Sequence, residues 1–105
     1  MRLGKTYSGT SIAEDTTKLE HNIPATLRFL NMVKADLEPM HRTTAANIQR
    51  EFQSLNPAHS EYQDEMAELM ADLENLMNDI CPDNTYFGNH PDDGANLGIW
   101  EVEAA

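Results

Sequence analysis

The chain has 105 residues, of which 40% are apolar, and its formal net charge is −11. This length allows one domain with a modest core. One cysteine excludes an internal disulfide framework, and no apolar run is long enough to span a bilayer, so we expect a cytoplasmic protein that does not bind membranes. All seven Lys and Arg lie in the first 50 residues, where they meet five acids, whereas the last 55 residues hold thirteen acids. An acidic half of this kind disfavours direct binding to nucleic acid and favours a basic protein partner.

The first 22 residues are expected to form an arm or a short helix. Residues 1–10 show little periodicity, which favours an extended arm or a short edge strand. Ser11 and Glu14 have the spacing of a capping box, in which each side chain bonds a backbone N–H near the start of a helix. This spacing predicts a short helix over 12–21.

Two helices are predicted in the middle of the chain. Pro24 is tolerated in the first turn of a helix because its missing N–H is not needed there, and the apolar spacing that follows it predicts a helix over 24–38. Pro39 should end that helix. Apolar residues at spacings of three and four predict another helix over 43–55.

The strongest periodicity lies between residues 60 and 81. Ser60 and Gln63 have capping-box spacing, and Pro82 should end the helix after Cys81. At about 100° per residue, the apolar side chains fall within an arc of roughly 120°. Six acids fall on the flank beside that arc: Glu61, Asp64, Glu65, Glu68, Asp72 and Asp79.

These acids form like-charged pairs three and four residues apart, which together cost roughly 1–2 kcal/mol at low salt. A row of carboxylates along a helix has a spacing similar to that of phosphates along a nucleic-acid strand. The pattern predicts a decoy surface for a basic site on another protein. Its charge would come from Glu61, Asp64, Glu65, Glu68 and Asp72, and its desolvated contacts from Tyr62, Met66, Met70 and Trp100.

Three other interpretations of this helix stay open. Its acids are either a solvated face or a face matched by the cations of the first half, namely Arg28, Lys34, Arg42 and Arg50. Its apolar face over 62–80 approaches a heptad pattern, which would suit a homodimer or a structural assembly protein.

The chain after Pro82 changes to a strand-like pattern. Residues 85–88 and 97–102 are short and alternating, and turn-forming residues fill 89–96, which predicts a β-hairpin with a loop of about eight residues. A lone hairpin is marginal in water, so it should lie on the helices. We therefore expect a mainly α (α+β) fold in one domain over 1–105. Its parts would be an arm or short helix (1–22), a helical region (23–81) and a hairpin (82–105) packed on the last helix.

The hairpin offers a different function, the binding of a small molecule or nucleotide. That site would use Tyr86, His90, Asp92, Asp93 and Asn96, under Trp100. One histidine beside two acids in a turn is a weak metal signal, because Asp and Asn in such loops usually bond their own backbone, so neither a metal nor a cofactor is predicted. The chain has no phosphate-binding glycine loop and no nucleophile motif, which predicts a non-enzymatic protein.

The string from Cys81 to Trp100 resembles a recurring tail, roughly PxxYFGxHPGDGADFGFW, of small uncharacterised proteins of bacteriophages and other mobile elements. This chain departs from that tail in having Asp92 for Gly, Asn96 for Asp, and Leu97 and Ile99 for Phe. The resemblance implies a genomic setting rather than a reaction. By analogy with that setting, we expect a protein that binds and inhibits a host protein in the bacterial cytoplasm.

Overall fold

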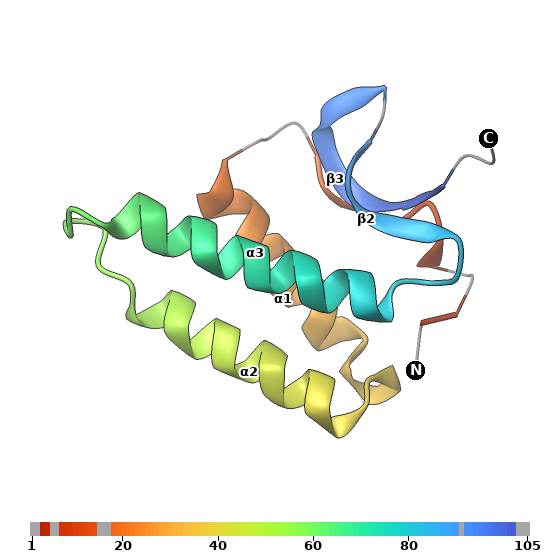
Figure 1. Cartoon of the computed structure of the whole chain (residues 1–105), viewed down its shortest axis with the longest axis horizontal. Coiled ribbons are helices and arrows are strands. Elements are labelled where there is room, and N and C mark those ends of the chain that lie inside the picture. Colours follow the sequence, from red (N-terminus) through yellow and green to blue (C-terminus); the bar gives the residue numbers. More distant parts are fainter. Residues whose placement is uncertain (1–2, 5–6, 15–17, 91, 103–105) are drawn as a thin grey trace.

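The computed structural model describes residues 3–4, 7–14, 18–90 and 92–102, which form a mainly α, α+β fold (Figure 1). The helices are α1 (Leu19–Met32), α2 (Pro39–Ser54) and α3 (Tyr62–Ile80), with a short 3-10 helix, η2 (Lys34–Asp36), between the first two. The strands are β1 (Ser11–Ala13), β2 (Thr85–His90) and β3 (Asp93–Glu101). The predicted fold class is confirmed. In the part of the chain that is described, none of the helices is both long and apolar enough to cross a bilayer.

Helix α3 lies at the centre of the core, as its periodicity predicts. Its seven buried residues are Met66, Leu69, Met70, Leu73, Leu76, Met77 and Ile80. The predicted capping box is wrong, because Glu61 rather than Ser60 is the N-cap residue and the Glu61 side chain makes no capping hydrogen bond. The backbone N–H of Glu61 instead donates to Nδ1 of His59 at 3.2 Å. Pro82 follows the end of the helix, as expected.

The other two helices have different limits from those predicted. Helix α1 begins at Leu19, so Pro24 lies inside it rather than at its start. It ends at Met32, and η2 forms where one continuous helix to residue 38 was expected. Pro39 is the first residue of α2, four residues before the predicted start, since its fixed φ suits the first helical position.

The sheet contains a third strand, β1, which lies just beyond the segment where an extended arm or edge strand was expected. Its order is β1-β3-β2, all antiparallel, so β3 is central. The predicted helix over 12–21 is wrong: Ser11 pairs with Gly98 in β1, α1 starts only at Leu19, and residues 15–17 lie outside the described chain. The edge strand expected within residues 1–10 is assigned slightly later, at 11–13, although Ile99 already bonds the backbone of Gly9 and Thr10.

The hairpin is longer than predicted. Strand β2 continues to His90 and β3 begins at Asp93, so the expected loop over 89–96 is wrong. Two polar residues of this segment bond across the sheet: Asn89 Nδ2 donates to the carbonyl of Gly94 at 2.6 Å, and Asn96 Oδ1 accepts from Ser11 Oγ at 2.6 Å. Side chains that usually form turns therefore extend the strand pairing here.

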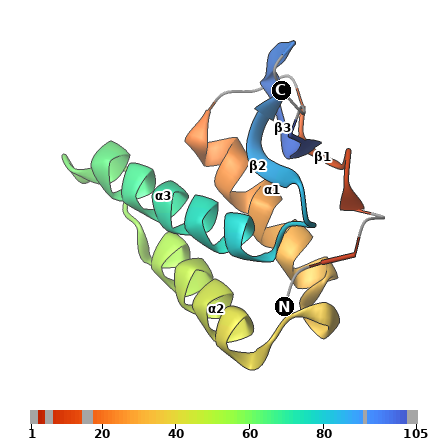
Figure 2. The same cartoon turned by 45° about the vertical axis from the view of Figure 1, so that its right-hand side comes forward.

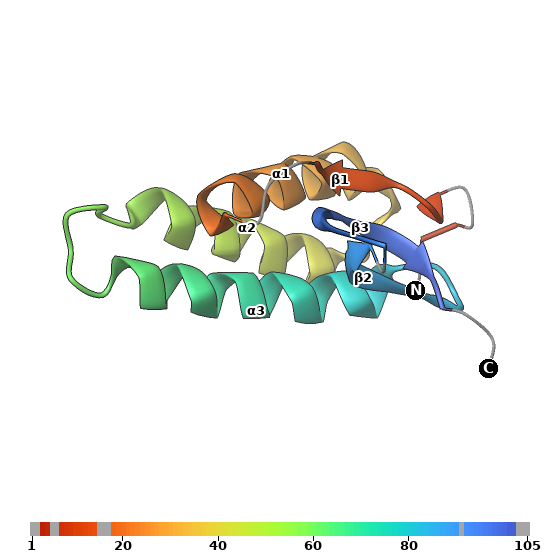
Figure 3. The ribbon, with the colours of Figure 1, turned by 90° about the horizontal axis from the view of Figure 1, so that it is seen from above.

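The sheet packs on the helices through Phe87, Leu97 and Ile99, which are buried (Figures 2 and 3). One of its two edges, β2, is tied to α3: Phe87 N–H donates to Asn78 Oδ1 at 3.0 Å. The N–H of Thr85, which points the same way, donates to the carbonyl of Pro82 at 3.2 Å. Strand β2 is thus bonded on both sides.

Gly98 is a position where this sheet requires glycine. A Cβ there would overlap the carbonyl oxygen of Thr10 and lie 2.7 Å from Cζ2 of Trp100. We expect Gly98→Ala to lower the free energy of unfolding by about 3 kcal/mol, because backbone and indole must both move. Urea unfolding measures this. Gly94→Ala is the matched control, since no atom lies within 4 Å of its Cβ, and an equal loss in both variants would contradict the explanation.

Candidate functional site: an acidic groove between α2 and α3

Two adjoining hollows, of about 410 and 330 Å³, lie between α2 and α3. Both are lined by Glu51 and Asp72, so they adjoin, and we treat them together as one groove. We call it the acidic groove after the five carboxylates that line it: Glu51, Glu65, Glu68, Asp72 and Asp79. Four of these come from the predicted acidic flank of α3, and Glu51 comes from α2.

The packing of α3 explains why its acids lie at this groove. Because its apolar face is buried, the helix cannot rotate, and the flank beside that face is fixed. Leu69 and Leu76 stand at the border between the two and line the groove floor. Helix α2 packs along this border, and therefore its Glu51 meets the acids of α3.

The cations of the first half do not neutralise the groove. No Lys or Arg occurs among the described residues that line it. Arg28, Lys34 and Arg42 line hollows between α1 and α2 instead. Arg50 does not line the groove, but its guanidinium bonds Oδ1 of Asn47, which does. None of these four cations forms an ion pair with an acid of the described chain, so they do not match the acidic flank within one molecule.

His41 adds an unsatisfied polar group to the groove wall. Its side chain is 8% exposed and lines the same hollow as Asp72 and Asp79. Its Nδ1 is buried and has no hydrogen-bond partner among the described residues. Buried polar atoms are nearly always bonded, so this end of the groove is a polar niche rather than a packed seam.

The other residues predicted to contact a partner are distributed differently. Glu61 and Asp64 are exposed and Tyr62 is half-buried, whereas Met66 and Met70 are buried, at 1% and 6% exposure. Their assignment to a contact surface is therefore wrong, because both belong to the core. For the same reason, the apolar face over 62–80 cannot form a homodimer in this fold. Trp100 lies in β3, where it pairs with Tyr86, and is not among the described residues that line the acidic groove.

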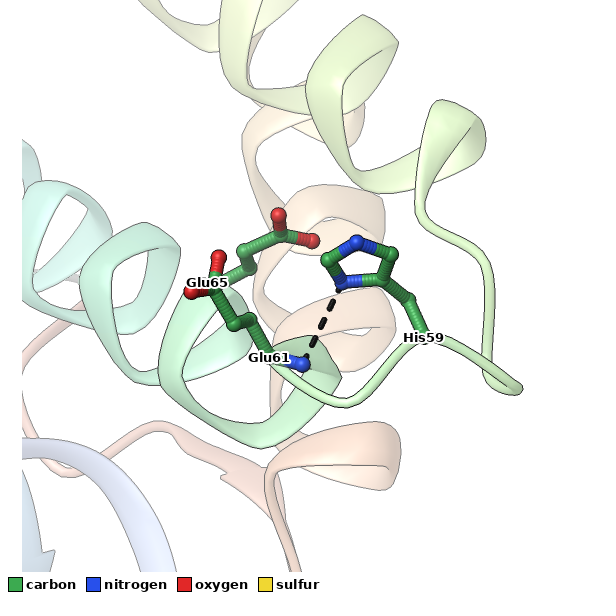
Figure 4. A group of neighbouring side chains, drawn as sticks. All are labelled: His59, Glu61 and Glu65. Atoms are coloured by element: carbon green, nitrogen blue, oxygen red, sulfur yellow. Dashed lines mark hydrogen bonds between the residues drawn. The ribbon is translucent and has the colours of Figure 1, made fainter.

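A second cluster stands at the start of α3, where possible ligand atoms of His59, Glu61 and Glu65 all lie within 4.8 Å of one another (Figure 4). An imidazole with two carboxylates suits zinc, manganese or iron. However, Nδ1 of His59 accepts the bond from the Glu61 N–H, which leaves the proton of the neutral ring on Nε2. Neither nitrogen then has a free lone pair, and we assign His59 to capping α3.

The predicted ligand site on the hairpin is only partly assembled. Tyr86 pairs with Trp100 across the strands, and the His90 ring meets the indole edge-on with centroids 4.7 Å apart. The indole N–H donates to the carbonyl of Gly88 at 2.8 Å.

The polar groups of that site are already engaged. His90 Nδ1 accepts from the Asp92 N–H at 3.0 Å, and Asn96 is bonded to Ser11. The side chain of Asp93 lies outside the described part. These bonds give the polar residues a structural role, and nothing in their geometry favours a ligand.

Comparison with known proteins adds no relative: no family model, no curated protein and no solved structure matches this chain. The acidic groove is therefore the feature on which a functional proposal rests.

The burial of Met66 makes it a test of the core assignment. Met66→Ala should lower the free energy of unfolding by about 2–5 kcal/mol, because it opens a cavity beside α3. Met40, which is 66% exposed, provides the control, and Met40→Ala should change stability by about 0.5 kcal/mol or less. Thermal or urea unfolding distinguishes the two. A Met66→Ala variant with wild-type stability would show that this side chain is free for a partner.

The uncompensated acids of α3 should themselves be detectable in stability measurements. Glu68 has like-charged neighbours three and four residues away at Asp64, Glu65 and Asp72, so Glu68→Gln should raise the free energy of unfolding by about 1 kcal/mol at low salt. The gain should disappear in about 1 M salt, which screens such pairs. Glu74 has no acidic neighbour at these spacings, and Glu74→Gln should give no gain. Equal effects of both changes would argue against repulsion within the groove.

Proposed function

We propose that this chain is a binding protein whose acidic groove receives a basic segment of another protein and blocks it. The observation that carries the proposal is the groove lining. Five carboxylates from two helices line the groove, and no Lys or Arg is among its described lining residues. Binding, rather than catalysis, is the action we assign to it.

The energetics favour such a partner. The fold holds the acids of α3 together at the cost of mutual repulsion, which a cationic partner relieves on binding. A groove of one charge with low-dielectric walls also concentrates its field, and this accelerates the approach of an oppositely charged surface. The carboxylates of Glu51, Asp72 and Asp79 give the groove exposed acceptors for the N–H groups of Lys or Arg.

The spacing of the acids suggests which basic proteins these are. Carboxylates that recur every three or four residues stand about 5–6 Å apart along α3, and this is similar to the phosphate spacing along one nucleic-acid strand. A surface that normally holds nucleic acid is therefore the partner class we propose. The resemblance of the C-terminal tail to phage proteins adds the setting, in which the partner is a host protein of the bacterial cytoplasm.

Charge reversal in the groove tests the proposal. Glu65→Lys/Glu68→Lys should fold like the wild type, because Glu68 is exposed and Glu65 only half-buried. Used as bait in a bacterial lysate, this variant should lose any basic protein that the wild type retains, and calorimetry on the purified partner should show affinity reduced at least about 100-fold, or roughly 3 kcal/mol. DNA should compete for the same partner.

The matched control reverses two acids outside the groove, in Glu14→Lys/Glu74→Lys. It changes the net charge by the same amount, and both side chains are exposed, so it should retain the partner. Loss of binding in both variants would indicate net charge alone. Retention of the partner by Glu65→Lys/Glu68→Lys would remove the groove from the function.

A further inference from the structure

A second groove, of opposite charge, lies on the other side of α2. Two hollows of about 560 and 220 Å³ between α1 and α2 are both lined by Leu27, Asn31 and Gln49, so they adjoin, and we treat them together as one groove. We call it the basic groove, because Arg28, Lys34 and Arg42 line it and no Asp or Glu does among the described residues. Helix α2 thus separates a basic groove from an acidic one.

The basic groove also offers apolar surface. Phe52, which is half-buried, and Leu27 line it. Met32, 68% exposed, stands at the same hollow. A groove with an apolar wall and cations beside it is suited to a helix whose exposed face carries acidic side chains and otherwise only small ones.

This chain itself presents such a helix. The solvent-facing ridge of α3 carries Asp64, Glu68 and Asp72, with the small residues Ala67 and Ala71 beside them, and all five are exposed. We call these residues the acidic ridge. Glu68 and Asp72 also line the acidic groove beside α2, whereas Asp64, Ala67 and Ala71 do not, and the exposure of all five lets them contact a groove on another molecule. The acidic ridge cannot reach the basic groove of its own chain, which α2 separates from it.

We propose that the basic groove receives the acidic ridge of a second copy of this chain. The contact is head-to-tail, because one surface of each copy meets a different surface of the next. Such contacts leave a free groove and a free ridge at the two ends, so they continue into a ring or an open filament.

The net charge of −11 does not prevent this contact at physiological salt. The Debye length is then about 8 Å, so the overall repulsion between two copies is largely screened, whereas charge pairs at contact distance are screened much less. We therefore expect weak, concentration-dependent association that is lost in about 1 M salt. The inference rests on the proposed function in one respect: Glu68 and Asp72 of α3 belong to both surfaces. A basic partner bound in the acidic groove would therefore compete with the second copy.

Sedimentation velocity of the purified full chain over a range of concentrations tests the proposal. In 0.15 M salt, the weight-average mass should rise to at least about twice the monomer mass and should fall back in 1 M salt. Arg28→Glu/Arg42→Glu and Asp64→Lys/Glu68→Lys should each remain monomeric. In each variant the groove and the ridge carry charge of the same sign, so they repel each other. An equimolar mixture of the two variants should associate, since the unchanged basic groove of one variant meets the unchanged acidic ridge of the other.

Arg50→Glu/Glu74→Lys is the control, because both residues lie outside the two grooves and the acidic ridge. It should associate like the wild type, and circular dichroism should confirm that every variant is folded. A monomeric wild type, or a mixture of the two variants that does not associate, overturns the proposal. The proposed function fails separately: Arg28→Glu/Arg42→Glu keeps the acidic groove intact, so it should still retain a basic partner even if no self-association exists.

Discussion

The burial of one face of α3 is the constraint on which the rest of the molecule depends. Seven apolar side chains of this helix are enclosed by α1, α2 and the sheet, and this fixes its rotation. The acids on the neighbouring flank are consequently held against α2 although they repel one another. Helix α2 then divides the surface into an acidic groove and a basic groove. The same burial removes Met66 and Met70 from any interface, so partner binding must rely on charge and on rim residues.

The parts of the fold that local periodicity determines were predictable. Helix α3 was found almost to the residue because its apolar spacing is regular and Pro82 ends it. Strand β1 was misplaced because Ser11–Ala13 is too short to alternate, and because Ser11 and Glu14 imitate a capping box. The extended hairpin was missed because Asn89 and Asn96, typical turn residues, bond across the sheet here. Such bonds depend on tertiary neighbours that no local pattern contains.

The candidate site was likewise predictable only in the part that local sequence determines. The acidic flank of α3 follows from its helical positions, and the structure keeps it on the surface. Glu51 and His41 were not predicted, because each reaches the groove only through the packing of α2 against α3. The positions of Arg28, Lys34 and Arg42 on the opposite side of α2 also depend on that packing. These cations were candidates to neutralise the acids of the same molecule, and their three-dimensional placement separates the two sets.

The bonding of strand β2 also governs how the protein behaves when it is concentrated. An uncovered edge strand offers its N–H groups to any other strand, which is a common start of fibril growth. Here the amide oxygen of Asn78 and the carbonyl of Pro82 already accept the two N–H groups that point outward from Phe87 and Thr85. Addition of a further strand is thereby opposed at the β2 edge, and the opposite edge, β1, is only three residues long, so concentrated protein has little exposed strand from which fibrils could grow.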